Sequence, residues 1–169
     1  MRMTEVATAL AEMPQMLKLA REVKPRPLAT RDCFALRVEQ TADKYPDRTA
    51  IICEGSRTSW REPNAQANRY AASLRRLGLR RGDSVSLMME NRVAFVSTII
   101  ALNKLGVTVA LLNTNLTGHP LVHCIAITGS RMCIFGEERL AAIGDIRQDP
   151  ALTGIEQYLF VTDSGTTPC

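Results

Sequence analysis

The sequence contains few aromatic residues and few histidines. Phe, Trp and Tyr make up 5% of the 169 residues, and the chain contains two histidines. Nucleic-acid-binding proteins combine basic surfaces with aromatic side chains, so this composition argues against a nucleic-acid partner. His119 and His123 are four residues apart, but no acidic residue lies between them and Pro120 follows the first. We therefore expect no metal site and interpret His123 as a packed or helix-surface residue.

Three common motifs of nucleotide binding and catalysis are missing. The sequence contains no glycine-rich dinucleotide fingerprint, no GxxxxGK[ST] phosphate loop and no GxSxG nucleophile elbow. The stretch Ser164–Thr167 has the small and hydroxyl residues of a phosphate loop, but only Pro168 and Cys169 follow it. Neither a helix N-terminus nor a lysine follows, so we interpret this stretch as a tail. No catalytic residue is assigned, and no cofactor-binding residue is identified.

The cysteine pattern and the apolar runs indicate a protein of the cytoplasm. The five cysteines are odd in number and none are spaced as in zinc or redox motifs, which favours a reducing compartment. No secretory signal is recognisable at the start. The longest uncharged apolar run, Val93–Asn103, is well short of the about 20 residues that span a bilayer. We therefore predict a buried helix there, followed by a turn and a buried strand.

Positive charge is concentrated in one segment. Between Arg69 and Asp83 five arginines face one acid, which equals the net charge of +4 for the whole chain. The arginines of this segment are Arg69, Arg75, Arg76, Arg80 and Arg81. The simplest interpretation is a solvated helix end and turn. The alternative is a surface that contacts a lipid or a partner protein.

The first 30 residues are predicted to form a helical arm and a linker. Apolar residues recur at helical spacing over residues 1–24, and Lys24–Pro27 then interrupts the pattern. A surface helix and a peripheral membrane anchor are both compatible with this stripe, although acidic residues on its polar face favour the surface helix. The body of the protein is predicted to occupy residues 31–169.

The body begins with a helix, a hairpin and a longer helix. Asp32 is expected to cap a helix that buries Phe34, Val38 and Ala42. Strands are predicted over 49–53 and 57–60, joined by a turn. Ser59 and Glu62 have the spacing of a capping box that opens a helix, and Gly78 is its expected end.

Strands and helices then alternate. The predicted strands are 84–89, 107–112, 131–135 and 157–161, and the predicted helices between them are 93–105, 116–127 and 137–143. These strands are continuous apolar runs, which is typical of a parallel sheet buried on both faces. The fold class is therefore α/β, a doubly wound and mostly parallel sheet with an N-terminal hairpin.

Ligands of open α/β sheets bind beyond the carboxyl ends of the strands. The polar segments expected there are Glu90–Arg92, Asn113–Asn115, Gly136–Glu138 and Asp163–Thr167. Asn113–Asn115 has a simpler interpretation, as a cap for the helix that follows. These segments form the candidate binding edge.

Several of these segments together resemble the N-terminal part of adenylate-forming acyl-CoA synthetases. The general likeness lies in Thr49–Ile52, Trp60–Glu62, Gln66–Arg69 and Leu77–Val85. The fatty acid transport protein or very-long-chain acyl-CoA synthetase branch is indicated by Met89–Arg92, Phe95, Val96, Lys104–Gly106, Ala110–Leu116, Leu121, His123 and Cys124. Pro63 departs from the leucine usual in this family. The resemblance covers about Phe34 to Phe135.

The resemblance implies a partial AMP-binding-type domain of an enzyme that activates a fatty acid with ATP and Mg²⁺ and transfers it to CoA. The family's phosphate loop and C-terminal domain are not recognisable here, so we expect this chain alone to be inactive. The alternatives are a non-catalytic module that binds a lipid or a partner, and a stand-alone nucleotide-binding domain. The missing phosphate motif argues against the last. Surface left unpaired in a partial domain is expected to promote self-association.

Overall fold

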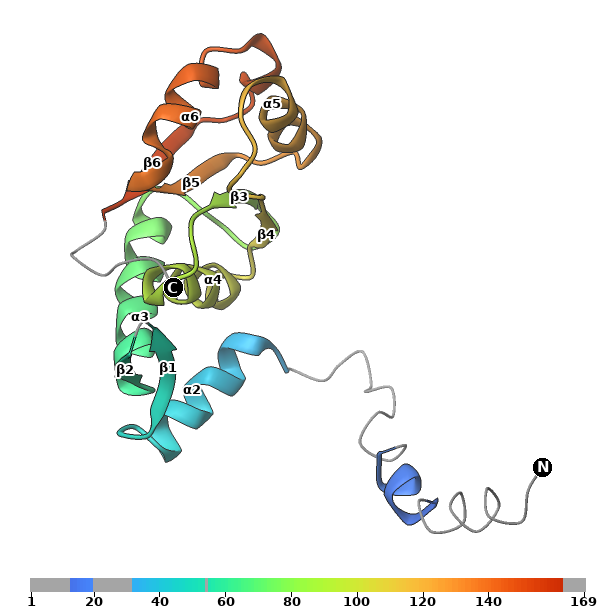
Figure 1. Ribbon diagram of the computed structural model, residues 1–169, viewed down its shortest axis with the longest axis vertical. Helices are drawn as coiled ribbons and strands as arrows, with labels where there is room; N and C mark the ends of the chain where they lie inside the picture. Colours follow the sequence, from blue (N-terminus) through green and yellow to red (C-terminus); the bar gives the residue numbers. More distant parts are fainter. Residues whose placement is uncertain (1–12, 20–31, 54, 163–169) are drawn as a thin grey trace. The chain divides into compact units, whose positions relative to one another are not determined.

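The computed structural model describes residues 13–19, 32–53 and 55–162 (Figure 1). The chain divides into two compact units, residues 1–32 and 33–169. In the first unit, residues 13–19 are helical. The rest of the predicted arm, its linker and Ser164–Thr167 lie outside the described residues.

The second unit begins with helix α2, Phe34–Lys44. Its N-cap position is Cys33, which makes no side-chain cap bond, so the prediction that Asp32 caps the helix is wrong. Val38 and Ala42 are buried as predicted, but in the first turn Ala35 is buried and Phe34 is exposed. The Ala35 N–H donates to Asn103 Oδ1 at 2.9 Å, which turns the small residue toward helix α4 (Val93–Leu105).

The predicted hairpin is confirmed. Strand β1 (Thr49–Cys53) pairs antiparallel with β2 (Ser56–Ser59), and helix α3 (Arg61–Arg76) follows directly. The capping box is half formed. Glu62 Oε1 accepts from the Ser59 N–H at 2.9 Å, but the Ser59 hydroxyl donates to the same oxygen and leaves the helix N–H groups uncapped. Gly78 follows the helix with φ +94°, the left-handed conformation predicted for its C-terminal stop.

Within the described residues, strands β3 (Ser84–Met88), β4 (Thr108–Leu111), β5 (Met132–Gly136) and β6 (Gln157–Val161) form a parallel sheet in the order β4-β3-β5-β6. The chain runs outward from β3 to β4 and then returns past β3 to β5. The direction of winding therefore reverses between β3 and β5, which is the position where open α/β sheets bind ligands.

Helices cover both faces of this sheet, as Figure 1 shows. Helices α3 and α4 pack on one face, and α5 (Gly118–Ile127) and α6 (Leu140–Ile146) pack on the other. A 3₁₀ turn, Glu137–Arg139, precedes α6. The predicted fold class, a doubly wound parallel sheet with a hairpin, is confirmed. Helix α5 begins two residues later than predicted, and α6 begins and ends three residues later than predicted.

The two faces of the sheet bury separate hydrophobic cores. On β5, Met132 and Ile134 contribute to the core beneath α3 and α4, whereas Cys133 and Phe135 contribute to the core beneath α5 and α6. Burial raises the pKa of the Cys133 thiol to about 12, so it stays protonated and behaves as a small apolar residue. Cys33, Cys124 and Cys133 are free thiols.

Among the described residues, no helix has both the length and the apolar content needed to cross a bilayer. Val93–Asn103 lies within α4, whose bounds match the prediction, and the strand expected after it is β4. Gly106 ends α4 with φ +70°.

Candidate functional site

The carboxyl edge of the sheet is organised around a buried arginine. The Arg92 side chain is 1% exposed, its Nη1 donates to Glu138 Oε2 at 2.8 Å, and its Nη2 donates to the Val161 carbonyl at 3.2 Å. Arg92 follows β3, Glu138 follows β5, and Val161 ends β6. One guanidinium therefore joins the ends of three strands at the point where the winding reverses.

Glu138 reaches this position because the residue two before it is glycine. Its Oε1 accepts from the Glu90 N–H at 2.9 Å, so the carboxylate bridges the segments that follow β3 and β5. A Cβ on residue 136 would overlap this carboxylate, and Gly136 is the residue that leaves the space. Glycine at position 136 is thus needed for the contact of Glu138 with the Glu90 N–H. The sequence spacing alone did not predict which group Glu138 would contact.

A second arginine completes the network. Arg139 Nη1 donates to the Thr114 carbonyl at 3.0 Å, and its Nη2 forms an ion pair with Glu90 Oε1. The segments after β3, β4 and β5, predicted to form a binding edge, are therefore joined to one another. Asn113 contributes differently from the prediction. Its Oδ1 accepts from the Asn115 N–H at 2.9 Å, while helix α5 begins after Thr117 without a side-chain cap.

These contacts define what the edge can do chemically. Two carboxylates, Glu90 and Glu138, face two guanidiniums, Arg92 and Arg139, so the charges cancel within the network. Its arginines are already bonded to carboxylates, which leaves them poorly placed to hold phosphate oxygens. No group of three or more His, Cys, Asp or Glu side chains in the described ranges could hold a metal ion. The edge therefore does not fit Mg²⁺, and no step through that ion is assigned to it.

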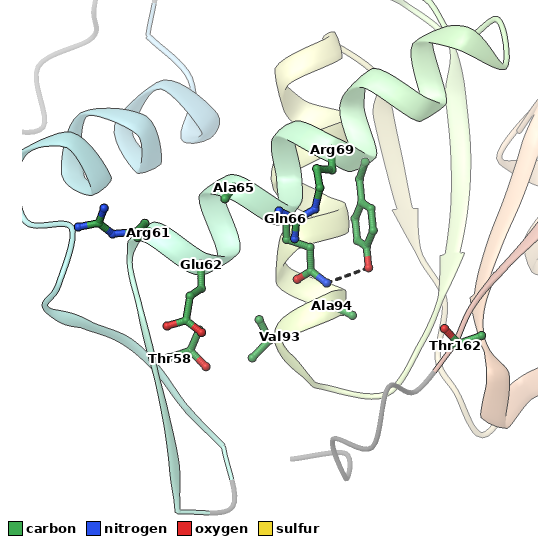
Figure 2. Close-up of a pocket in the computed structure, with 10 residues that line it drawn as sticks. Thr58, Arg61, Glu62, Ala65, Gln66, Arg69, Val93, Ala94 and Thr162 are labelled. Atoms are coloured by element: carbon green, nitrogen blue, oxygen red, sulfur yellow. Dashed lines mark hydrogen bonds between the residues drawn. The ribbon is translucent and has the colours of Figure 1, made fainter.

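A pocket of about 480 Å³ lies beside this edge (Figure 2). It is bounded by α3, by Val93 and Ala94 at the start of α4, and by Thr58 and Thr162. Gln66 donates to the Tyr70 hydroxyl at 2.9 Å across one wall. The Ser59 backbone and hydroxyl bonds lower the pKa of the Glu62 carboxyl, which is therefore ionised at neutral pH. The lining holds neither histidine nor cysteine. The polar groups of its lining are hydroxyls, an amide, a carboxylate and two guanidiniums, which can form hydrogen bonds and ion pairs with a ligand.

The basic segment predicted between Arg69 and Asp83 divides between two places. Arg69 lines the pocket of Figure 2. Arg75, Arg80 and Arg81 line a different cavity of about 640 Å³, near the amino ends of β3 and β4. All three are exposed, in agreement with the solvated helix end and turn that the sequence predicted.

The remaining candidates are separate from these sites. His119 and His123 both lie on α5 and are exposed, so His123 is a helix-surface residue and not a packed one. Sequence reasoning missed Arg139 and Arg131. Arg131 Nε pairs with Glu156 at 2.8 Å and its Nη1 with Asp83 Oδ2 at 3.3 Å, contacts that depend on the strand order. The hydrogen bond to Glu156 raises the pKa of the Arg131 guanidinium above its ordinary value.

Curated proteins similar in sequence to this chain include a fatty acid transport protein and a fatty acid–CoA ligase. Bovine long-chain fatty acid transport protein 1 is 36% identical over 110 residues, which cover 64% of this chain and 17% of that protein. The medium/long-chain-fatty-acid–CoA ligase FadD6 of Mycobacterium tuberculosis is 29% identical over 107 residues, 63% of this chain and 18% of the ligase. The chain thus spans about a sixth of the length of these curated relatives.

Solved structures agree with the sequence comparisons. The N-terminal domain of FACL13 from Mycobacterium tuberculosis matches with a TM-score of 0.70 and 28% identity, covering 75% of this chain and 33% of that one. Residues 38–164 match the family described as AMP-binding enzyme. This match includes the whole parallel sheet, both flanking helix layers and the network around Arg92. The chain therefore belongs to the AMP-binding enzyme family, as a partial domain similar to fatty acid transport proteins and fatty acyl-CoA synthetases.

Proposed function

We propose that this chain is the N-terminal portion of a long-chain or very-long-chain fatty acyl-CoA synthetase. Such an enzyme uses ATP and Mg²⁺ to convert a fatty acid to its acyl-adenylate and then transfers the acyl group to CoA. Family membership and the names of the relatives support the assignment. The proposed organisation is an arm and linker over residues 1–30, followed by a partial synthetase domain over 31–169.

The ion-pair network at the sheet's carboxyl edge is the observation that indicates what this segment contributes to such an enzyme. Formation of an acyl-adenylate from ATP needs hydrogen-bond donors aimed at the negative charge that develops on the phosphates. Here Arg92 and Arg139 are instead bonded to Glu138 and Glu90. The edge therefore acts as a scaffold that fixes the ends of four strands. We infer that the 169 residues do not ligate acyl groups by themselves.

The direct test is an assay of the purified chain with ATP, Mg²⁺, CoA and radiolabelled oleate. We expect neither acyl-CoA nor AMP above the level of a heat-denatured sample. FadD6 assayed in parallel is the positive control, because its name states the activity. ATP-dependent acyl-CoA formation by the isolated chain would overturn the inference of inactivity.

A chimera tests the scaffold role separately. Residues 33–162 of this chain replace the matched segment of FadD6, so that the rest of the ligase supplies the reaction centre. We expect fatty acyl-CoA synthesis to be retained, and to be lost when Arg92→Ala is added. A folded chimera that is inactive without the substitution would contradict the synthetase assignment, whatever the isolated chain does.

A second candidate function is a non-catalytic module that binds a lipid or a partner protein at the cytoplasmic side of a membrane. One observation favours it, namely that the cavity near the amino ends of β3 and β4 is lined, among the described residues, by four cations and by no acid. Self-association is a further expectation. Leu111 on edge strand β4 and Phe160 on edge strand β6 are 57% and 53% exposed. Sedimentation velocity at rising concentration tests it, and a single monomeric species throughout would contradict it.

A further inference from the structure

The cavity at the amino end of the sheet has an unusual charge balance. Its lining consists of Arg75, Gly78, Leu79, Arg80, Arg81, Lys104 and Leu105, which we call the arginine groove. Four of these residues are cations and none is an acid. The groove is formed by the end of α3 and the loop before β3 on one side, and by the end of α4 on the other.

Two acids that contact groove residues, Glu39 and Asp83, are already engaged in ion pairs. Lys104 forms an ion pair with Glu39, so neither group has an unbalanced charge. Asp83 accepts from the Arg80 backbone N–H at 2.8 Å and pairs with Arg131 Nη1. In contrast, the guanidinium groups of Arg75, Arg80 and Arg81 have no ion-pair partner in the part of the chain that the structure describes. Three positive charges therefore face the groove without compensation.

One of these arginines is held in place by its stem. A Cβ on Gly106 would lie 3.0 Å from Arg81 Cγ, so the aliphatic part of Arg81 packs directly against the glycine that ends α4. Gly106 has φ +70°, a conformation that favours glycine. The guanidinium of Arg81 is thus presented from a supported stem, which reduces the entropy lost when it binds an anion.

A guanidinium presents paired N–H donors that match the oxygens of a phosphate group. The sequence neighbour of the groove, Leu77, is a large apolar side chain that is 41% exposed between two turns rich in arginine. Cations beside an exposed apolar side chain are typical of surfaces that bind the headgroup layer of a membrane. Charge complementarity accounts for a phosphate group, and the exposed Leu77 side chain favours a lipid over a soluble phosphate.

We propose that the arginine groove binds the phosphate group of an anionic phospholipid at a membrane surface. The inference rests on the second candidate function and is independent of acyl-CoA synthesis. It assigns the groove to docking, at the end of the sheet opposite to the edge where synthetase chemistry is expected. Arg75, Arg80 and Arg81 are the residues that contact phosphate, and Leu77 enters the headgroup layer.

The test is co-sedimentation of the full chain with vesicles of phosphatidylcholine, with or without about one fifth phosphatidic acid. We expect binding to the anionic vesicles at low salt and little binding to phosphatidylcholine alone. Each arginine near an anionic surface contributes about fivefold in affinity, so Arg75→Gln, Arg80→Gln and Arg81→Gln combined should weaken binding about 100-fold. Leu77→Ser should weaken it by a smaller factor.

A charge-matched control distinguishes the groove from net charge. Arg48→Gln, Arg57→Gln and Arg147→Gln combined remove the same charge from exposed positions outside the groove. We expect this variant to bind like the unmodified chain. Equal losses in the two triple variants would overturn the proposal, as would full binding by the groove variant, which would assign binding to the N-terminal arm. Circular dichroism melts check that both variants fold.

Inorganic phosphate is the second probe. Amide and arginine side-chain NMR shifts are followed as phosphate is added, and we expect small shifts at Arg75, Arg80 and Arg81 at millimolar concentration. Saturable phosphate binding at the groove without vesicle binding would contradict a lipid ligand and indicate a soluble one. Neither measurement involves ATP or CoA, so a negative result in both would not contradict the synthetase assignment. Likewise, an inactive FadD6 chimera would not contradict lipid binding by the groove.

Discussion

The two ends of the parallel sheet use arginine in opposite ways. At the carboxyl end, Arg92 is buried and bonded to Glu138, and Arg139 is paired with Glu90. At the amino end, Arg75, Arg80 and Arg81 are exposed and line a groove without acids. The reason is the cost of removing a charge from water, which a buried ion recovers only through a partner. A buried arginine in this segment is therefore evidence of structure, and an exposed unpaired one is the better guide to function.

The largest expected effect is that of Arg92→Ala. It leaves the Glu138 carboxylate and the Val161 carbonyl without their buried donor, which should lower the free energy of unfolding by about 3–5 kcal/mol. Urea denaturation of the full chain measures this. The matched control is Arg80→Ala, for which we expect a change of less than about 0.5 kcal/mol. Similar losses in the two variants would remove the distinction between the two ends of the sheet.

The next effect is that of Gly136→Ala. The added methyl group must displace the Glu138 carboxylate and with it the bond to Arg92, at a cost of about 2 kcal/mol. If displacement is the cause, the same substitution should cost much less in a chain that already carries Glu138→Ala. Equal losses of unfolding free energy in both backgrounds would show that the cost comes from the backbone at residue 136 and not from displacement of the Glu138 carboxylate.

The pair between Arg139 and Glu90 should give a smaller effect. Both side chains are about one quarter exposed, and a double-mutant cycle with alanine at each position should give a coupling energy of about 1 kcal/mol. The exposed pair of Arg61 with Asp47 is the control, with an expected coupling close to zero. A coupling at Arg139 no larger than this control would mean that the network consists of Arg92 and Glu138 alone.

The smallest effect belongs to Glu62, an exposed carboxylate at neither end of the sheet. Hydrogen bonds from Ser59 lower its pKa below 4.5, so its contribution is present above that pH and is lost as the pH falls through the folded-state pKa. Solvent screening limits the contribution to about 0.5 kcal/mol or less. The stability difference between the unmodified chain and Glu62→Gln should therefore shrink as the pH is lowered below 4.5. A difference that does not change with pH in the acid range would exclude the carboxylate as its source.

Local patterns predicted the elements well because the signals that start and stop them are adjacent in sequence. The bounds of α4 and β6 match the prediction, since an apolar run ends at Gly106 in one case and at polar residues in the other. On α2 the prediction was wrong at one position, because Ala35 and not Phe34 is buried. Positions 34 and 35 both have helical spacing to Val38, and the contact from Ala35 to Asn103 decides between them.

The network at the carboxyl edge could be predicted only in part. The sequence placed Glu90, Arg92 and Glu138 at one edge, but the contact of Arg92 with Glu138 spans 46 residues and depends on β3 lying beside β5. A buried hydroxyl cluster shows the same limit. Ser86 Oγ lies 2.8 Å from Ser130 Oγ and 3.2 Å from Thr128 Oγ1, and neither partner is close to it in sequence. Pairings of this kind follow from topology, which local periodicity does not encode.

The alternation of β5 between two cores has a consequence for how the length of this segment can vary. An insertion or deletion of one residue within Met132–Gly136 would turn Met132 and Ile134 toward α5 and α6, and Cys133 and Phe135 toward α3 and α4. Both cores would change at once, so neither could compensate for the other. An extra residue in the exposed turn at Thr153 and Gly154 leaves both cores intact. We therefore expect insertions such as epitope tags to be tolerated in this turn and not within β5.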